Sequence, residues 1–446
     1  MGLPKAAEPL VSPFSIAFTR PTFQRVTVLI LGAIMAARHR TVTGMLRAAG
    51  SLAKGHWSDF HRVLSLRVWS NWPLGRVLAT LILELAPPDQ PVVIPVDDTT
   101  PQHKGKQVYG KGCHHDAVRS THRHTVWVWG HKWVVLAINI KFPFATRPWA
   151  LPVLCALYRS EELDRQEGRR HKTPIDLALG LVAALIHWFP ERKFILAGDG
   201  GYASHKLARF CHQHRGHVSL VSRFHGDANL YDAPPAKRGQ TGRPRQKGGK
   251  LPAPSQVVKK AKRRRFTVDW YGGQNRRVEL VWGDAHWYKS GEGLVPIRGV
   301  FVHDLQGTHR DEYFYTTDTT LPPEKIVSLF TGRWSLEVTF EEVRRHLGFT
   351  TPRNWSPKSV LRTAPCLLGL FSLVSLIFHR VHNRRPVAPR RDPWYNKKEV
   401  TFSDAIAAVR RLCWSEVLAK PMKPAGISKL PSRLRLTLLD QLCRAA

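Results

Sequence analysis

Acidic residues are scarce in this chain. Its 446 residues include 33 Asp and Glu against 68 Lys and Arg, which gives a formal net charge of +35 and a pI of about 10.6. An enzyme of small metabolites has no use for such a field, whereas a polyanion binder gains affinity as each neutralised phosphate releases counterions. Nucleic acid is therefore the expected partner, and a merely basic surface is the alternative.

Cysteines and long apolar runs are also few. The six cysteines include no C-x-x-C pair and are too sparse for a disulfide scaffold, so we expect a reducing, cytoplasmic location. The N-terminus lacks the basic and apolar segments of a signal peptide. The most apolar stretches, 26–37 and 364–378, are shorter than the roughly 20 residues that span a bilayer, which predicts buried core helices and no membrane contact. The chain has no P-loop, which argues against an ATP-driven motor.

The hydrophobic pattern predicts helical ends around an α/β centre. Residues 1–88 have the periodicity of several short helices with basic corners, which is compatible with DNA binding and equally with a plain helical bundle. Over 89–224, strands are followed by alternating strands and helices, which indicates a mixed α/β sheet. Short strand patterns fill 225–310, a helix is predicted from 322 to about 347 within 311–382, and 383–446 is basic and helical again.

Basic residues concentrate in two Pro-containing stretches. The segment 234–265 contains no acid and should form a mobile basic loop, and 384–398 is the second stretch. The candidate DNA-binding side chains, including two that follow the first strand of the α/β part, are Lys104, Lys106, Lys237, Arg238, Arg243, Arg245, Lys259, Lys260, Arg263, Arg264, Arg265, Arg390 and Arg391.

Three aspartates stand at the ends of predicted strands. Asp97 and Asp98 follow the apolar run 92–96, and Asp199 lies between two glycines after the run 194–197. Strand ends in open α/β sheets are where sites form, and two carboxylates on adjacent strands can hold Mg²⁺ through oxygen ligands. A turn or a cap after each strand is the simpler interpretation of each segment taken alone.

The predicted helix over 322–347 supplies a third carboxylate. Phe330, Arg333, Glu337 and Arg344 have offsets of 3, 4 and 7, which place them on or near one helix face. A Glu between two Arg could bind metal while the Arg side chains hold phosphates. Solvated ion pairs are the alternative, but the order of all three segments in a chain of charge +35 favours a two-metal phosphodiester site.

These segments resemble the DDE-type transposases of bacterial insertion sequences. VIPVDDTTPQHKGK is similar to the first-aspartate strand of that family, and LAGDGGYAS is similar to the second. FTGRWSLEVTFEEVRRHLGF resembles the Y-x2-R-x3-E-x6-K signature, with Phe330 in place of Tyr and Arg344 in place of Lys. The resemblance spans roughly 90–380.

The resemblance implies a catalytic triad of Asp98, Asp199 and Glu337, which would bind two Mg²⁺ or Mn²⁺ ions. Asp98 is preferred because the catalytic Asp of the family directly precedes Thr; Asp97 remains possible, since strand alternation lets only one of the two face the metals. Arg333 would contact phosphate. Phe330 lacks the signature hydroxyl, and Arg344 keeps the charge of the signature Lys with another geometry.

The resemblance also implies a ribonuclease-H-like fold with a β-rich insertion. Asp199 and Glu337 are 138 residues apart, which agrees with the branch that inserts a subdomain, here 225–310, before the Glu helix. In that branch an inserted Trp can stack on a flipped base; Trp282 and Trp287 are the candidates, with a core role as the alternative for each.

The implied activity is cut-and-paste DNA transposition. Its partners would be terminal inverted repeats and target DNA, bound by a homodimer. The alternatives are a DNA-binding regulator that lacks activity and a nuclease that cuts without joining.

Overall fold

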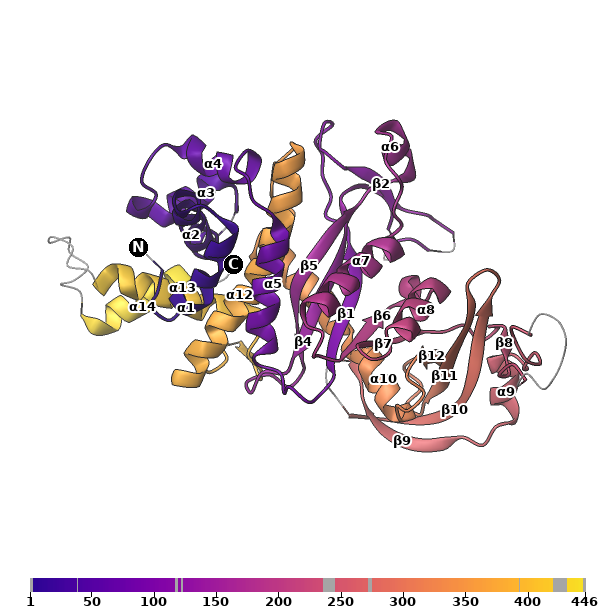
Figure 1. The fold of residues 1–446 in the computed structure, drawn as a ribbon. Coiled ribbons are helices and arrows are strands. Elements are labelled where there is room, and N and C mark those ends of the chain that lie inside the picture. The colour runs from indigo at the N-terminus through magenta and orange to yellow at the C-terminus, as the bar shows by residue number, and fades with distance from the viewer. Residues whose placement is uncertain are drawn as a thin grey trace.

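A large mixed sheet lies beside a helical part that both ends of the chain build (Figure 1). The computed structural model describes residues 3–37, 39–116, 119–121, 123–235, 245–271, 275–392, 394–419 and 431–443. The predicted α/β architecture with helical ends is confirmed.

The sheet has ten strands in the order β5-β4-β1-β6-β7-β12-β11-β10-β8, and β9 also pairs with β10. β1, β6 and β7 run parallel, and the other pairs are antiparallel. The strands are β1 (Val92–Thr99), β4 (Lys132–Ile140), β5 (Trp149–Tyr158), β6 (Phe194–Gly198), β7 (Val218–Arg223), β8 (Leu230–Tyr231), β9 (Arg264–Asp269), β10 (Asn275–Lys289), β11 (Gly293–Asp304) and β12 (Glu312–Thr316). Two small ribbons stand apart: β2 (Gly112–His115) with β3 (Trp127–Gly130), and β13 (Arg391–Asp392) with β14 (Tyr395–Asn396).

Both faces of the central strands are buried, each against a different set of helices. Leu196 of β6 belongs to the main core, which includes residues of α7 (Pro174–Trp188) and α8 (His205–Gln213). Its neighbour Ile195 belongs to a second core, which includes residues of α10 (Pro323–Gly332). Because side chains alternate along a strand, these two cores lie on opposite faces of β6. The face shared with α10 carries the candidate site.

The helices of the two chain ends pack together, as the indigo and yellow ribbons of Figure 1 show. The guanidinium of Arg410 donates to the carbonyls of Ile34 at 2.7 Å and Ala36 at 3.0 Å, at the end of an N-terminal helix. These helices are α1 (Glu8–Val11), η1 (Ser12–Ala17), α2 (Arg20–Met35), α3 (Val42–Ala49), η2 (Gly50–Leu52), α4 (Trp57–Ser65), α5 (Asn71–Leu83), α12 (Pro357–Arg384), α13 (Phe402–Ala419) and α14 (Ser432–Cys443). The other helices are α6 (Glu161–Gln166), η3 (Gly200–Tyr202), α9 (Pro254–Lys260) and α11 (Trp334–His346).

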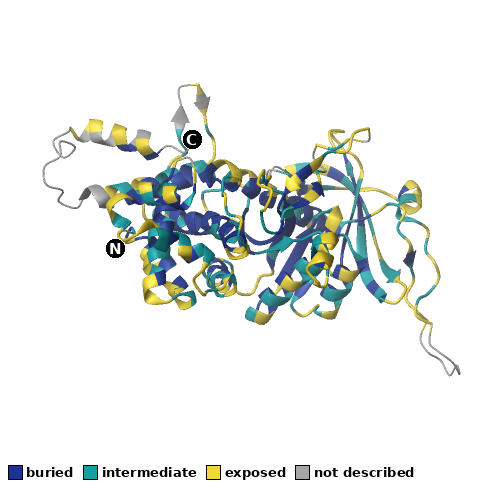
Figure 2. Cartoon of the chain, turned by 90° about the horizontal axis from the view of Figure 1, so that it is seen from above, coloured by how far each residue is buried: buried dark blue, intermediate teal, exposed yellow. Residues whose placement is uncertain are grey.

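The helix α12 runs through the middle of the protein. Among the described helices it alone is long and apolar enough to cross a membrane, but 72% of its most apolar window is buried inside the fold. Figure 2 shows the buried residues gathered in the centre of the molecule. A helix buried in this way is a core helix, in agreement with the prediction for 364–378.

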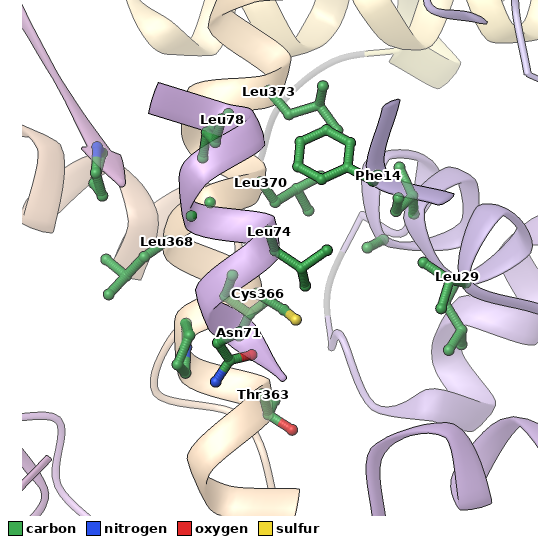
Figure 3. A pocket seen from close by; sticks show the side chains of 18 of the residues that line it. Phe14, Leu29, Asn71, Leu74, Leu78, Thr363, Cys366, Leu368, Leu370 and Leu373 are labelled. Atoms are coloured by element: carbon green, nitrogen blue, oxygen red, sulfur yellow. The ribbon is translucent and has the colours of Figure 1, made fainter. Parts of the chain in front are cut away.

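An apolar cavity of about 250 Å³ lies between α5, α12 and the first helices. Figure 3 shows Leu74 and Leu78 of α5 on one side, with Phe14 and Leu29 across from them. None of the three predicted catalytic carboxylates lines this cavity.

Two predicted elements differ from the structure. The segment 234–265 is not one loop, because α9 and the start of β9 lie within it; 236–244 lies outside the described residues. The helix predicted over 322–347 is two helices, α10 and α11, which meet at Arg333. The strands of 225–310 extend the central sheet through β12, which pairs with β7.

Candidate active site

Three polar side chains stand side by side at the carboxyl edge of the parallel strands. Val96 of β1 pairs with Gly198 of β6, and Gly198 pairs with Ser222 of β7. The next residues in the chain are Asp97, Asp199 and Arg223. Because the strands are parallel and in register, these three residues project from the same face. It is the face that α10 and α11 cover.

Arg333 joins the strand edge to the helix. Its Nη1 donates to Oδ2 of Asp97 at 2.6 Å, and its Nη2 donates to Oε1 of Glu337 at 2.9 Å. Arg333 keeps helical backbone angles at the junction of α10 and α11, so Glu337 lies one turn further on the same side. One guanidinium therefore bridges two carboxylates that are 240 residues apart in the sequence.

Hydrogen bonds fix the start of α11 on the sheet. The hydroxyl of Ser335 donates to Oδ1 of Asn139 on β4 at 3.0 Å, and Asn139 donates to the carbonyl of Gly332 at 3.3 Å. The hydroxyl of Thr339 donates to the carbonyl of Ala150 on β5 at 2.8 Å. These contacts set the position of Glu337 relative to the strand ends.

The carboxyl group of Asp97 is strongly perturbed. Burial raises its pKa to about 7, against the lowering effect of Arg333, and the nearby charges of Asp199 and Asp98 raise it further. A buried carboxyl that is surrounded by other carboxylates needs a nearby positive charge to stabilise its ionised form. Arg333 supplies part of that charge.

Asp98 points to the opposite face of the sheet. Its Oδ2 forms an ion pair with Nζ of Lys132 at 3.3 Å, on β4. The structure therefore brings Asp97, not Asp98, together with Arg333.

Asp199 is held by the turn that follows β6. Its Oδ1 accepts from the amide of Gly201 at 2.9 Å, and its carbonyl accepts from the hydroxyl of Ser222 at 2.8 Å. A Cβ on Gly198 would lie 2.7 Å from Cβ of Tyr202, so only glycine fits beside this aspartate. The half-exposed carboxylate of Asp199 keeps one oxygen without a protein hydrogen bond among the described residues.

Two site residues were not found from the sequence. Arg223 forms an ion pair with Glu312 of β12, and its guanidinium lies 5.9 Å from the ring of Phe330. Burial raises the pKa of Tyr271 to about 12, and its hydroxyl also responds to the charges of Glu312, Arg223, Arg333 and Glu337. Arg223 could have been noticed as a basic residue at the end of the strand after Asp199; Tyr271 carries no such signal.

The other signature positions have separate roles. The guanidinium of Arg344 donates to the hydroxyl of Thr99 at the end of β1. Phe330 is buried and stacks on Phe314 with ring centroids 4.2 Å apart. Phe330 thus belongs to the second core.

The predicted DNA-binding residues divide into three groups. Exposed side chains that the structure describes are Lys104, Lys106, Arg245, Lys259, Lys260, Arg263, Arg264 and Arg265. Arg390 is half-buried, and its amide donates to Asp404 at 3.3 Å. Lys237, Arg238 and Arg243 lie outside the described residues, as does the side chain of Arg391.

Both candidate tryptophans lie on β10 and pack against neighbouring side chains. Trp287 lies edge-on to His205, Phe224 and Tyr315, with ring centroids 5.2 to 5.6 Å apart. Trp282 lies between Phe266, at 5.7 Å, and the guanidinium of Arg264, at 5.3 Å. These contacts are those expected of tryptophans with a core role. Base stacking by either ring stays a prediction.

The donor set of the site suits a hard divalent cation. Asp97, Asp199 and Glu337 offer only oxygen atoms, which Mg²⁺ and Mn²⁺ prefer. Within the part of the chain that the structure describes, no three His, Cys, Asp or Glu side chains are grouped as a metal site. Instead, the guanidinium of Arg333 lies between two of the three carboxylates.

Comparisons with known proteins show the family of the chain. No curated protein matches the chain. A cryo-EM structure of a piggyBac transposase synaptic complex with hairpin DNA is similar to this chain. The alignment covers 99% of this chain and 82% of the transposase chain, at 10% identity and a TM-score of 0.39. The sequence model of the DDE superfamily endonucleases matches residues 13–277, which include Asp97 and Asp199. Because this match covers more than half of the chain, the protein belongs to the DDE superfamily endonuclease family.

Proposed function

We propose that this protein is a DNA transposase of the insertion-sequence branch with the Y-R-E-K signature. It would cleave DNA at the ends of its element and transfer the new ends to target DNA, on a ribonuclease-H-like core. The observation that carries the proposal is the meeting of Asp97, Asp199, Arg333 and Glu337 at one strand edge. Membership of the endonuclease family and the charge of +35 support it.

In this proposal Asp97 takes the place that the family resemblance implied for Asp98. Asp97 is in register with Asp199 on the face of α11, whereas Asp98 pairs with Lys132 on the other face. Asp97, Asp199 and Glu337 would hold Mg²⁺ or Mn²⁺, two ions in the expected site. When bound, such ions activate the attacking hydroxyl and stabilise the leaving oxygen of a phosphodiester.

The basic residues of the site would orient the phosphate. Arg333 pairs with Asp97, and Arg223 ends the strand beside that of Asp199; both are forked donors suited to phosphate oxygens. Arg344 would hold the end of β1 through Thr99. Phosphoryl transfer depends on in-line positioning and charge stabilisation, and these side chains supply both.

The remaining regions would hold DNA. We assign DNA-backbone contacts to the helical region 1–88, to the exposed cations of the insertion 225–310 and to the basic region 383–446, with 89–224 and 311–382 as the catalytic core. Two element ends must be held together, so a homodimer on DNA is expected. We place the protein in the cytoplasm.

A cleavage assay tests the proposal. The substrate is a DNA fragment that carries the sequence flanking the reading frame, incubated with Mg²⁺ or EDTA and with wild-type protein or Glu337→Gln. We expect Mg²⁺-dependent nicks at the element ends and joined products with a second DNA, both lost in Glu337→Gln. Equal binding by both proteins without any cutting would favour the regulator, and nicks without joined products would favour the nuclease.

A further inference from the structure

The small ribbon of β2 and β3 has one buried and one exposed face. His114 and Val128 face inward, and the ring of His114 lies 5.8 Å from that of Tyr158. Alternation along the two strands turns Trp127 and Trp129 outward. Trp127 is 60% exposed and Trp129 is 59% exposed.

Two exposed tryptophans on one ribbon face are unusual. Large aromatic rings contribute most when they are buried, and contiguous exposed apolar surface marks an interaction site. The Cα atoms of Trp127 and Trp129 are two residues apart along one strand, about 6.8 Å, which is close to twice the rise of about 3.4 Å per nucleotide in a DNA strand. His115 of β2 lies beside Trp127, with ring centroids 5.8 Å apart.

Hydrogen bonds attach this ribbon to the chain that leaves the catalytic edge. The amide of His131 donates to the carbonyl of Pro101 at 3.1 Å, and the amide of His103 donates to the carbonyl of Trp129 at 3.0 Å. A Cβ on Gly130 would lie 2.3 Å from the oxygen of Pro101, so the two segments are in direct contact. Pro101 is only four residues after Asp97. The tryptophan face therefore has a fixed position relative to the carboxylates.

The surroundings of the two rings are cationic. Nζ of Lys111 lies 5.4 Å from the centre of the Trp129 ring. Lys104, Lys106 and Arg119 are exposed in the segments around the ribbon. Asp116 is the single acid among residues 99–132, and it forms an ion pair with Arg119 at 3.7 Å. Aromatic rings among cations are the combination that binds single-stranded nucleic acid, because every base offers a π-face to stack on.

We propose that Trp127 and Trp129 form a stacking platform for unpaired bases of DNA beside the cleavage edge. The inference rests on the proposed function, since it assigns to the same site the part of the DNA that has left the duplex. A duplex keeps its bases stacked inside and would engage the platform only through its backbone. The platform therefore predicts a preference for unpaired over paired DNA.

Fluorescence anisotropy with two labelled probes tests this preference. One probe is an oligo-dT single strand, and the other is a blunt-ended duplex with an equal number of phosphates. In Trp127→Ala/Trp129→Ala we expect affinity for the single strand to fall about tenfold or more, since each stacked base is worth roughly 5- to 150-fold. Affinity for the duplex should stay within about twofold. Quenching of a 2-aminopurine placed in the single strand should disappear in the same variant.

Two control variants separate stacking from other causes. Trp127→Phe/Trp129→Phe keeps π-faces and should retain most of the affinity and the quenching. Leu305→Ala removes an exposed apolar side chain, at 41%, directly after β11, and it should leave both probes unaffected. Circular dichroism melting of each variant reports whether it is folded. Unchanged single-strand affinity in a folded double-alanine variant, or an equal loss for both probes, would overturn the proposal.

The outcome is distinguishable from that of the cleavage assay. If the wild-type protein binds single strands through the two rings but never cuts element ends, the platform stands and the transposase proposal fails. If it cuts and joins ends while the double-alanine variant binds single strands as tightly as the wild type, the platform fails alone.

Discussion

Nη1 of Arg333 lies 2.6 Å from Oδ2 of Asp97, across 236 residues of sequence. This ion pair connects the helix junction to the end of β1, on the face where Asp199 and Arg223 also project. It shows which of two adjacent aspartates faces the site. It also gives the site a positive charge of its own, held between the carboxylates that would receive a metal ion.

Asp97 and Asp98 should respond very differently to substitution. Asp97→Asn removes a ligand from the proposed metal site, and we expect cleavage of element ends to fall by about 1,000-fold. Asp98→Asn removes only the partner of Lys132 on the opposite face, so cleavage should stay within about tenfold of the wild type. The measurement is the initial rate of strand cleavage at saturating Mg²⁺. The reverse order of the two effects would restore the sequence-based choice of Asp98.

The affinity for divalent ions should rise with pH through neutrality. Burial raises the pKa of Asp97 to about 7, so this carboxyl is neutral below that pH and ionised above it. Because a metal ion must displace the proton, the affinity for Mn²⁺ should fall roughly tenfold per pH unit below the pKa and level off above it. Titration calorimetry at several pH values between 6 and 8.5 measures this dependence. Asp97→Asn should bind weakly with little dependence on pH; a flat wild-type profile would contradict the assignment.

The sequence could predict which segments supply the carboxylates of the site, but not the face of the sheet on which each side chain lies. The run before Asp97 is VVIPV, apolar at every position, because the strand is buried on both faces; it therefore contains no alternation that would tell Asp97 from Asp98. The direction became visible only through the register of β1 against β6, which is set by tertiary pairing. Glu337 and Arg333 were predictable, because helical spacing is a local property.

Long-range pairing also explains the residues that the sequence did not reveal. Arg223 belongs to the site because β7 pairs in register with β6, and nothing in the local sequence SLVSRF states that register. The basic segment 234–265 was interpreted from its composition, but part of it forms β9 because β10 offers a partner edge. The composition of a segment indicates how well water solvates it. It does not indicate which strand the segment pairs with.

Arg223 should act in catalysis without holding a metal ion. Arg223→Gln keeps the strand and removes the cation beside Asp199, so we expect cleavage to fall by about 10- to 100-fold while Mn²⁺ affinity is unchanged or higher. Arg209→Gln, a substitution on α8 at the other face, is the matched control and should leave both quantities near the wild-type values. A loss of Mn²⁺ affinity in Arg223→Gln would mean that this side chain supports the carboxylates and not the phosphate.

Arg362 should contribute strongly to the stability of the fold. Its guanidinium is buried on α12 and donates to the carbonyls of Leu64 at 3.0 Å, Arg67 at 2.7 Å and Trp69 at 2.8 Å, where the chain leaves α4. Arg362→Leu removes the buried donor of these three hydrogen bonds, so the free energy of unfolding should fall by about 3 kcal/mol or more.

Urea unfolding, followed by circular dichroism, measures this loss. Arg353→Leu removes an exposed arginine from the segment just before α12 and should change the stability by less than about 0.5 kcal/mol. Equal midpoints for the two variants would show that α12 does not depend on Arg362 to hold the N-terminal helices. The expected difference would instead demonstrate that one buried cation connects the two ends of the chain, because the carbonyls that it binds and the helix that carries it are almost 300 residues apart.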